Sequence, residues 1–253
     1  MDGGRFKFVD LFAGIGGFHH ALAELDGECV LAVERDIDCQ KVYRRFPTRL
    51  DSDIREITRY ADGTDQSLED VDERVPDHDV LCAGFPCQPF SKSGFQEGVR
   101  DRTRGTLFHD VMTIVMAKKP QFVMLENVRN LAGPRHRDTW KDIIDSLRSE
   151  GYRVRTEPLV LSPHRLSKED GGAPQVRDRV FILAYRLSGP EKLDSEPLLS
   201  RDLSPGWDPD CWRIEDYLDD DDSIDNLADY KLSDAERTWV EAWQAFVERI
   251  ESD

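Results

Sequence analysis

Short apolar runs alternate with longer amphipathic stretches up to about residue 186. The apolar runs predict β-strands at Phe6–Phe12, Cys29–Glu34, Asp79–Gly84, Phe122–Glu126, Tyr152–Leu161 and Arg179–Tyr185. The amphipathic stretches predict helices at Gly17–Leu25, Ile37–Phe46, Leu107–Lys118 and Thr139–Glu150. Strands that alternate with helices are typical of βαβ units, and the continuous apolar run Val180–Ala184 favours a strand that is covered on both sheet faces. The pattern therefore predicts a doubly wound α/β sheet.

The pattern changes after residue 186, where turn signals and the acidic run Asp219–Asp222 interrupt the periodicity. Ser233 followed by Glu236 is the signature of a capping box at the start of a helix. The apolar face predicted for that helix consists of Trp239, Trp243, Phe246, Val247 and Ile250. We expect this face to pack in the chain's own core rather than against a missing domain or a second chain. The sequence thus predicts a domain of residues 1–186 and an acidic extension of residues 187–253.

Charge is distributed unevenly between these two parts. The chain of 253 residues has a net charge of −17, and residues 187–253 contribute −14 of it. Residues 1–186 are therefore nearly neutral, and only the extension would strongly repel a phosphate backbone.

Cysteine usage and the absence of long apolar runs narrow the class of protein. No apolar run approaches the roughly 20 residues that span a bilayer, and Met1–Arg5 shows no secretory signal. We therefore expect a cytoplasmic protein without a membrane segment. The five cysteines contain no C-x-x-C pair, which argues against zinc and predicts no metal site. Their odd number favours reduced thiols, so that Cys87 is free to act as a thiolate.

One candidate ligand site follows the first predicted strands. Asp10–Gly17 opens the first helix with glycines that let a backbone approach a ligand, although the spacing does not fit G-x-G-x-x-G. Glu34 ends the second strand, where a carboxylate can accept both hydroxyls of a ribose. Asp53–Ile54 comes where a third strand should end, and would read an adenine amino group and cover its face. A tight turn beside a solvated strand end is the structural alternative, but the turn and the acid together favour an adenosyl ligand.

A second candidate site surrounds Cys87, which lies between two prolines in Phe85–Ser91. Proline fixes φ and pushes the preceding residue out of helical space, so this turn is stiff. A stiff turn suits a nucleophile, which needs a fixed approach, whereas a buried cysteine at a strand end is the structural alternative. Glu126–Val128 closes the next predicted strand, and Gln175–Arg179 precedes the last one. Ligands bind outside the carboxyl ends of strands in doubly wound sheets, so Cys87 and Glu126 are expected to lie there together.

These segments, in this order over about residues 6–186, resemble the DNA (cytosine-5) methyltransferases. The resemblance implies a class I, Rossmann-like methyltransferase sheet, S-adenosyl-L-methionine as cofactor, and double-stranded DNA as partner. The cofactor-binding residues that it implies are Asp10, Phe12, Ala13, Gly14, Ile15, Gly16, Gly17, Glu34, Arg35, Asp53, Ile54, Gly84, Pro86 and Leu107. The substrate-binding residues that it implies are Phe85, Gln88, Ser91, Arg104, Asn127 and Gln175.

The resemblance also implies a reaction in which Cys87, Glu126, Arg177 and Arg179 are catalytic. The Cys87 thiolate would add to carbon 6 of cytosine, so that carbon 5 can attack the sulfonium methyl group. Glu126 would hold a proton at ring N3, Arg177 would orient the base and support its carbonyl oxygen, and Arg179 would help to build the pocket. The base must leave the stacked duplex for this chemistry, and residues 91–105 correspond to the loop that closes over it.

The chain departs from the family after Gln175–Arg179, because we find neither a target-recognition domain nor a G-N-x-V-like segment in residues 187–253. Three readings stay open: a catalytic half with a partner polypeptide for recognition, a truncation, or a non-catalytic cofactor-binding subunit. The leading hypothesis is cytosine methylation in a restriction–modification system. Methylation of cytosine in transfer RNA is an alternative, which the absence of a C-F-T segment disfavours. A nicotinamide oxidoreductase is disfavoured by the glycine spacing.

Overall fold

The computed structural model describes residues 5–86, 106–167, 171–187, 213, 218–220 and 223–250. The chain divides into two compact units, Met1–Trp207 and Asp208–Asp253, and each is described by itself. The boundary that the sequence predicts after residue 186 stays a prediction.

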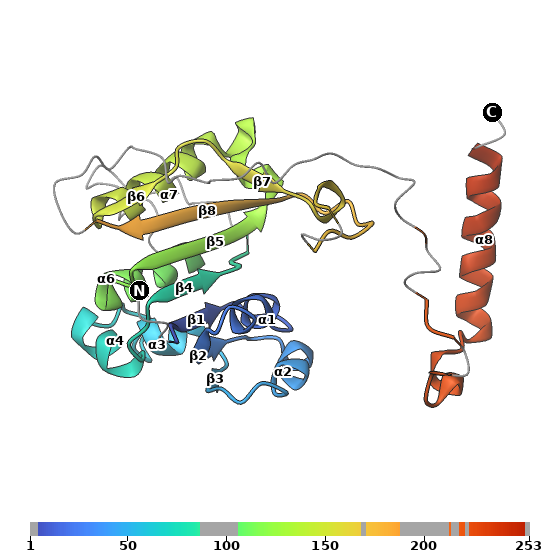
Figure 1. The fold of residues 1–253 in the computed structure, drawn as a ribbon, viewed down its shortest axis with the longest axis horizontal. Helices are drawn as coiled ribbons and strands as arrows, with labels where there is room; N and C mark the ends of the chain where they lie inside the picture. The colour runs from blue at the N-terminus through green and yellow to red at the C-terminus, as the bar shows by residue number, and fades with distance from the viewer. Residues whose placement is uncertain are drawn as a thin grey trace. The chain divides into compact units, whose positions relative to one another are not determined.

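A mixed β-sheet forms the centre of the first unit (Figure 1). Its strands are β1 (Lys7–Leu11), β2 (Glu28–Val33), β3 (Leu50–Asp51), β4 (Val80–Ala83), β5 (Phe122–Val128), β6 (Tyr152–Val154), β7 (Leu159–Leu161) and β8 (Arg179–Arg186). The order is β3-β2-β1-β4-β5-β8-β6, and β7 also pairs with β8. The first five strands are parallel, whereas β8 runs antiparallel to β5, β6 and β7. The loops after β1, β2, β4 and β5 therefore meet at one edge of the sheet.

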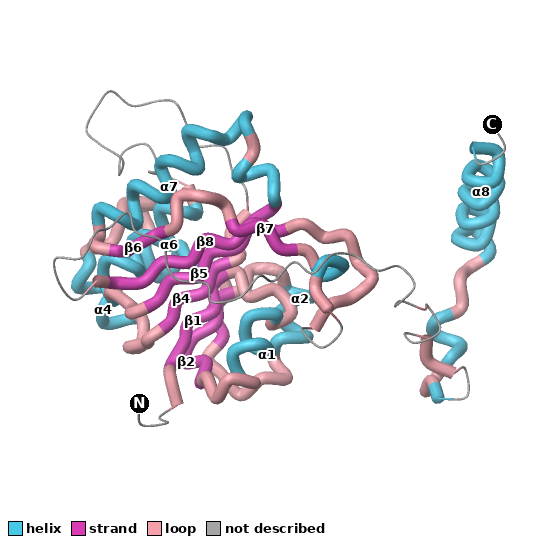
Figure 2. The backbone as a smooth tube through the Cα atoms, turned by 45° about the horizontal axis from the view of Figure 1, so that its top comes forward, coloured by secondary structure: helices cyan, strands magenta, loops and turns pink. Residues whose placement is uncertain are grey.

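Helices cover both faces of this sheet (Figure 2). They are α1 (Gly17–Ala23), α2 (Ile37–Tyr43), α3 (Ile54–Thr58), α4 (Leu68–Arg74), α6 (Leu107–Lys118) and α7 (Arg137–Ser149), with 3-10 turns η1 (Arg129–Ala132), η2 (Pro134–His136) and η3 (Pro163–Arg165). Alternate strand residues such as Phe8 and Val9 enter two different apolar clusters. Leu22 and Tyr43 of α1 and α2 join the first cluster, and α3, α4, α6 and α7 join the second. The predicted doubly wound α/β sheet is confirmed.

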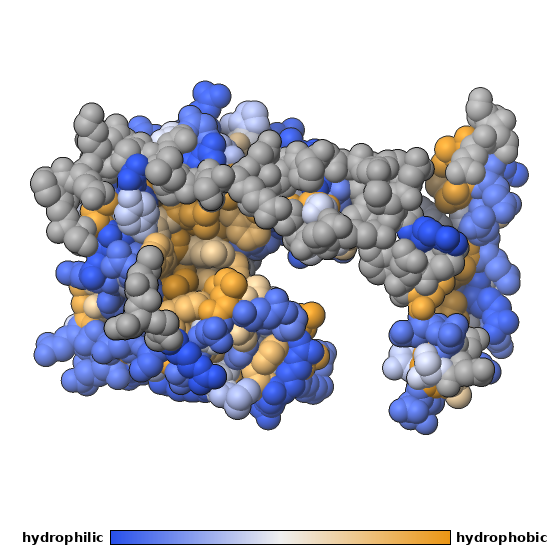
Figure 3. Space-filling model, viewed as in Figure 1, coloured by the Kyte–Doolittle hydropathy of each residue, from blue (hydrophilic) through white to orange (hydrophobic). Residues whose placement is uncertain are grey.

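Two predicted features of the last strands differ from the structure. Residues 152–161 form two strands rather than one, because five steps along the chain from Val154 to Leu159 face only three steps of β8. A regular ladder cannot absorb the two additional residues. The run Val180–Ala184 buries only alternate residues, and neighbouring Phe122 of β5 is 50% exposed. Apolar side chains accordingly lie at the surface of this unit in Figure 3, so the expectation of a strand covered on both faces is wrong for the described residues.

The second unit contains η8 (Leu227–Tyr230) and the amphipathic helix α8 (Asp234–Ile250). Its predicted capping box is confirmed, because the Ser233 backbone N–H donates to Glu236 Oε2 at 2.8 Å while the Glu236 N–H donates to Ser233 Oγ at 3.4 Å. No residue of α8 is buried within this unit, and Trp239 is 79% exposed. Packing of this face in the chain's core stays a prediction.

Two glycines between β1 and α1 provide a matched test of stability. Gly14 and Gly16 have φ of +55° and +95°, where a side chain costs roughly 1 kcal/mol. A Cβ on Gly14 would have no atom within 4 Å, whereas one on Gly16 would lie 2.4 Å from Phe46 Cε2. The Phe46 ring is stacked on His19 and cannot move freely. We expect Gly16→Ala to lower the free energy of unfolding by about 2–4 kcal/mol and Gly14→Ala by about 1 kcal/mol. Equal losses of unfolding free energy in the two variants, measured by denaturant unfolding, would contradict the steric role of Phe46 beside Gly16.

Candidate functional site

The glycine turn after β1 is built from left-handed backbone positions. Phe12, Gly14 and Gly16 all have positive φ, and the Ala13 N–H donates to the Val33 carbonyl at 3.0 Å. The turn is thereby fixed to the end of β2 and leads directly into Gly17, the first residue of α1. Ile15 at its tip is 58% exposed. The turn presents backbone and an apolar side chain at the carboxyl edge of the sheet.

The Glu34 carboxylate connects this turn with the start of α2. Its Oε2 accepts from the Gly14 N–H at 2.7 Å, and its Oε1 accepts from the Asp36 N–H at 2.6 Å. Asp36 is itself the N-cap of α2. The exposed Arg35 brings its Nε within 4.0 Å of Asp53 Oδ2. Asp53, which is distant in sequence from Glu34 and Arg35, therefore lies along one edge with them, beside the glycine turn.

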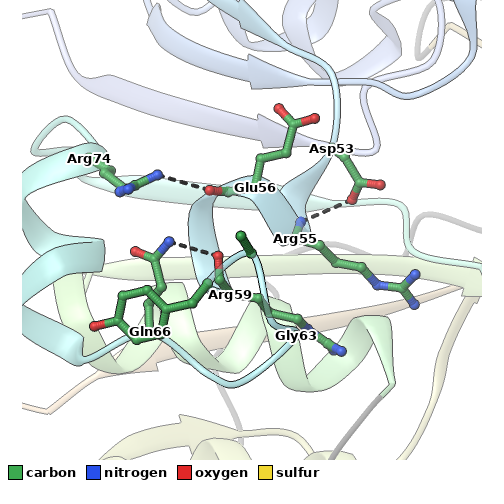
Figure 4. A pocket seen from close by; sticks show the side chains of 9 residues that line it. Asp53, Arg55, Glu56, Arg59, Gly63, Gln66 and Arg74 are labelled. Carbon is green, nitrogen blue, oxygen red and sulfur yellow. Dashed lines mark hydrogen bonds between the residues drawn. The ribbon is translucent and has the colours of Figure 1, made fainter.

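Asp53 is the N-cap of α3, since its carboxylate accepts from the Arg55 N–H at 3.0 Å. Ile54 beside it is 2% exposed and belongs to the core. Asp53 borders a pocket of about 530 Å³, whose other lining residues are Arg55, Glu56, Arg59, Tyr60, Ala61, Gly63, Gln66 and Arg74. In Figure 4 the Arg74 side chain reaches toward the Glu56 carbonyl, to which it donates at 3.0 Å, whereas the Arg55 side chain extends away from Arg74. Arg59 is bound to Asp110 at 2.9 Å, and Arg55 Nε lies 3.9 Å from the same carboxylate. These arginines do not converge on one ligand group.

Glu126 on β5 lies between the two predicted sites, the cofactor site at the glycine turn and the site around Cys87. Arg179 Nε is 2.8 Å from Glu126 Oε1, and both side chains are about one quarter exposed, 23% and 24%. A Cβ built on Gly84 would lie 3.4 Å from Glu126 Oε2 and 3.8 Å from the Phe12 carbonyl. A side chain at position 84 would thus fill the space between the carboxylate and the glycine turn. Gly84 therefore leaves this space open.

The turn that leads to Cys87 is held by Asn127. The Asn127 Nδ2 donates to the Phe85 carbonyl at 2.7 Å, and its Oδ1 accepts from the Val128 N–H at 2.8 Å. Asn127 and Phe85 are buried, whereas Pro86 is exposed. Asn127, predicted to bind substrate, therefore contacts the backbone two residues before Cys87. Leu107 begins α6 and packs at the border of the core.

Four predicted site residues, Cys87, Gln88, Ser91 and Arg104, lie outside the described residues. The segment Gln175–Arg179 is described, and its Gln175 and Arg177 side chains are exposed. The Arg177 N–H donates to Ser162 Oγ at 3.0 Å, while Arg179 is the arginine that faces Glu126. The sequence assigns different roles to these two arginines, but it does not show which of them faces Glu126.

Asp10 lies beneath the glycine turn rather than on its surface. Its side chain is fully buried, and the Tyr43 hydroxyl donates to its Oδ2 at 3.2 Å. Burial raises the pKa of Asp10 from 3.8 to about 7, and the hydrogen bond from Tyr43 only partly opposes this shift. His19 Nδ1 is 2.8 Å from the same hydroxyl. A direct contact between Asp10 and a cofactor stays a prediction.

Sequence reasoning missed three polar residues that organise the site. Tyr43 anchors Asp10, Ser162 holds the Arg177 backbone, and Arg129 Nη1 pairs with Asp178 Oδ2 at 2.6 Å. Arg129 follows Glu126–Val128 so closely that it could have been identified as a rim residue. No sequence signal marks Tyr43 or Ser162, because their partners come from other elements of the fold.

The raised pKa of Asp10 predicts a pH-dependent stability. The unfolded carboxyl group titrates near 3.8 and the folded one near 7, so the folded chain binds an additional proton between these values. The free energy of unfolding should therefore fall as pH rises from about 4 to about 7, by an amount of the order of 4 kcal/mol. Asp10→Asn should flatten this part of the curve of thermal midpoint against pH. Asp38→Asn, which removes an exposed carboxylate, is the control, and parallel curves for Asp10→Asn and the unchanged chain would contradict the prediction.

Among the described residues, no helix is long and apolar enough to cross a membrane. Within the same residues, no group of three or more His, Cys, Asp or Glu side chains is arranged to hold a metal ion.

Solved structures with a similar fold include a mutant of Spodoptera frugiperda DNMT2, with a TM-score of 0.53 and 26% identity over 79% of this chain and 56% of that one. Dnmt2 of S. pombe has a TM-score of 0.51 and 20% identity over 74% of this chain and 51% of that one. The α/β sheet is therefore of the Rossmann-like type found in methyltransferases.

Sequence relatives cover most of this chain but only part of their own length. Type II methyltransferase M.AluI of Cellulosimicrobium cellulans is 38% identical over 94% of this chain and 50% of its own length. Type II methyltransferase M.HhaI of Haemophilus parahaemolyticus is 38% identical over 71% of this chain and 49% of its own length. The chain thus spans about half the length of these relatives. A family model for C-5 cytosine-specific DNA methylases matches residues 6–251. The chain belongs to the C-5 cytosine-specific DNA methylase family.

Proposed function

We propose that this chain transfers a methyl group from S-adenosylmethionine to carbon 5 of a cytosine in double-stranded DNA, within a restriction–modification system. The membership of this chain in the family, and the fact that its relatives are named type II methyltransferases, support the reaction and the substrate. The observation that carries the proposal is the position of the Glu126 carboxylate, 3.4 Å from where a Cβ of Gly84 would lie and next to the glycine turn. The carboxylate that would contact the cytosine and the glycine turn that would bind the cofactor therefore lie at the same edge of the sheet.

The residues present fit the cofactor. Gly14 leaves open space above the turn, and the Glu34 carboxylate lies at the end of β2, where ribose hydroxyls can replace its present backbone donors. Asp53 and Ile54 would hold the adenine, and Ile15 offers an exposed apolar contact. S-adenosylmethionine supplies an electrophilic sulfonium methyl group when it is bound.

The chain's own residues make the cytosine reactive. The Cys87 sulfur forms a bond to carbon 6, and the electron pair of the 5,6 double bond becomes available at carbon 5. Carbon 5 would use this pair to take the methyl group, whose bond to the cofactor sulfur would break and leave a neutral thioether. Glu126 holds a proton at N3, so that negative charge does not accumulate on the ring. Loss of the carbon 5 proton to a base then breaks the bond between sulfur and carbon 6 and returns the thiolate. Asn127 keeps the Phe85–Pro86 backbone, and hence the start of the Cys87 turn, in place.

Arg179 takes the role beside the base that the sequence assigns first to Arg177. Its Nε is bound to Glu126, so it orients the carboxylate and places a positive charge next to the cytosine carbonyl oxygen. The cytosine must be flipped out of the duplex to reach this carboxylate.

The test is transfer of a radiolabelled methyl group to duplex DNA, measured with the chain alone and with a candidate recognition polypeptide. We expect label in DNA and none in DNA whose cytosines already carry a 5-methyl group. Transfer to transfer RNA instead would favour the RNA alternative. Cofactor binding without transfer to either nucleic acid, with or without a partner, would favour a non-catalytic cofactor-binding subunit.

A further inference from the structure

Positive charge is concentrated at one edge of an acidic chain. The described segments 129–137, 162–167 and 171–179 contain six arginines, namely Arg129, Arg135, Arg137, Arg165, Arg177 and Arg179. Their one acidic residue is Asp178. These segments have a net charge of about +5, whereas the whole chain has a net charge of −17. They therefore form a basic region in an acidic protein.

The fold brings these segments together beside the site. Arg129 Nη1 lies 2.6 Å from Asp178 Oδ2, the Arg177 N–H donates to Ser162 Oγ at 3.0 Å, and the His164 N–H donates to the Gln175 carbonyl at 3.3 Å. Hydrogen bonds from Arg129 and Ser162 hold the pKa of Asp178 below its ordinary value, and the charges of Arg129 and Arg165 add to this effect. The carboxylate stays ionised and balances one arginine, which leaves the cluster positive.

Five of these arginines are accessible. The Arg129 side chain is 62% exposed, and Arg135, Arg137, Arg165 and Arg177 are also exposed. Arg179 differs, because it is largely covered and bound to Glu126. Figure 1 shows that the loop before β8 and the end of β5 lie side by side. Arg129 and Arg177 follow and precede the paired residues Val128 and Arg179, and neither of them is bound to Glu126 in the structure.

We propose that Arg129, Arg165 and Arg177 form a phosphate-binding rim, which holds the backbone of duplex DNA beside the reacting base. This inference rests on the proposed function and assigns a surface to it. Guanidinium groups match the geometry of phosphate oxygens, and contacts of this kind fix the position of a duplex without reading its sequence. Each such contact releases counterions from DNA, so each contributes to the salt dependence of binding.

The test measures binding of the full chain to a short fluorescent duplex by anisotropy, from low to physiological ionic strength. We expect Arg165→Gln and Arg129→Gln each to reduce the slope of log affinity against log salt by about 0.9. Arg165→Lys should restore most of the slope, because a lysine also neutralises a phosphate. Arg44→Gln is the matched control, since Arg44 is an exposed arginine at the end of α2, the helix that follows β2, and three strands separate β2 from β8. The slope of log affinity against log salt for Arg44→Gln should equal that of the unchanged chain.

The outcomes separate this inference from the function on which it rests. If the unchanged chain binds and methylates DNA while both glutamine variants keep its slope and thermal midpoint, the rim is wrong and the function stands. If the unchanged chain neither binds nor methylates DNA, both are wrong. Tighter binding to an RNA hairpin, with the same losses of slope, would overturn the assignment to duplex DNA.

Discussion

Cys87→Ala is expected to reduce methyl transfer to DNA by at least about 10³-fold, because the proposed mechanism uses the Cys87 sulfur to form the bond to carbon 6. Carbon 5 of cytosine is too weak a nucleophile to attack the methyl group unless this bond is made. The Asn127 side chain that holds the Phe85 carbonyl is unaffected by the change. Affinity for the cofactor and for the duplex should therefore stay close to that of the unchanged chain. Single-turnover transfer of a radiolabelled methyl group measures the loss.

Cys39→Ala is the control for this variant. Cys39 lies on α2 and is a free, partly exposed thiol, whereas Cys29 and Cys82 are buried. Burial raises the pKa of Cys29 to about 11, so that this thiol is a poor nucleophile. Transfer should persist in Cys39→Ala. Full activity in Cys87→Ala would remove the covalent step from the proposed mechanism.

Glu126→Gln is expected to lower kcat by about 10²–10⁴-fold, the range that a positioned proton donor contributes. Glutamine keeps the size of the side chain but cannot place a proton on N3. It also breaks the ion pair with Arg179 Nε, which is 2.8 Å from the carboxylate. Because Glu34 and the glycine turn are untouched, cofactor affinity should change little. The measurement is kcat at saturating DNA and cofactor, with cofactor affinity from calorimetry.

Glu28→Gln makes the same chemical change at the opposite end of the sheet. Glu28 is the exposed first residue of β2, so this variant should keep the kcat of the unchanged chain. If Glu126→Gln also kept it, the carboxylate would have a structural role only. If both variants lost activity together with thermal stability, the loss would report folding rather than proton transfer.

Predictions that rest on local patterns agree with the structure. The strands that begin the chain, the capping box at Ser233 and the position of Glu34 after β2 all depend on residues that are close in sequence. The predicted strand at residues 152–161 is wrong because its break depends on β8, with which it pairs. The short helices α3 and α4 were not predicted, since α3 has only five residues and α4 has only two apolar side chains, Leu68 and Val71, which are too few for a clear helical period.

The amino-acid sequence by itself determined the class of sheet, the order of the motifs and the residue types that the chemistry needs. Only the tertiary structure decided that Arg179 rather than Arg177 faces Glu126, that Asp10 is buried on Tyr43, and that Arg129 meets Asp178. The physical reason is that each of these contacts joins elements far apart along the chain. Local propensities carry no information on such pairs, whereas sheet register and burial place their atoms within hydrogen-bonding distance.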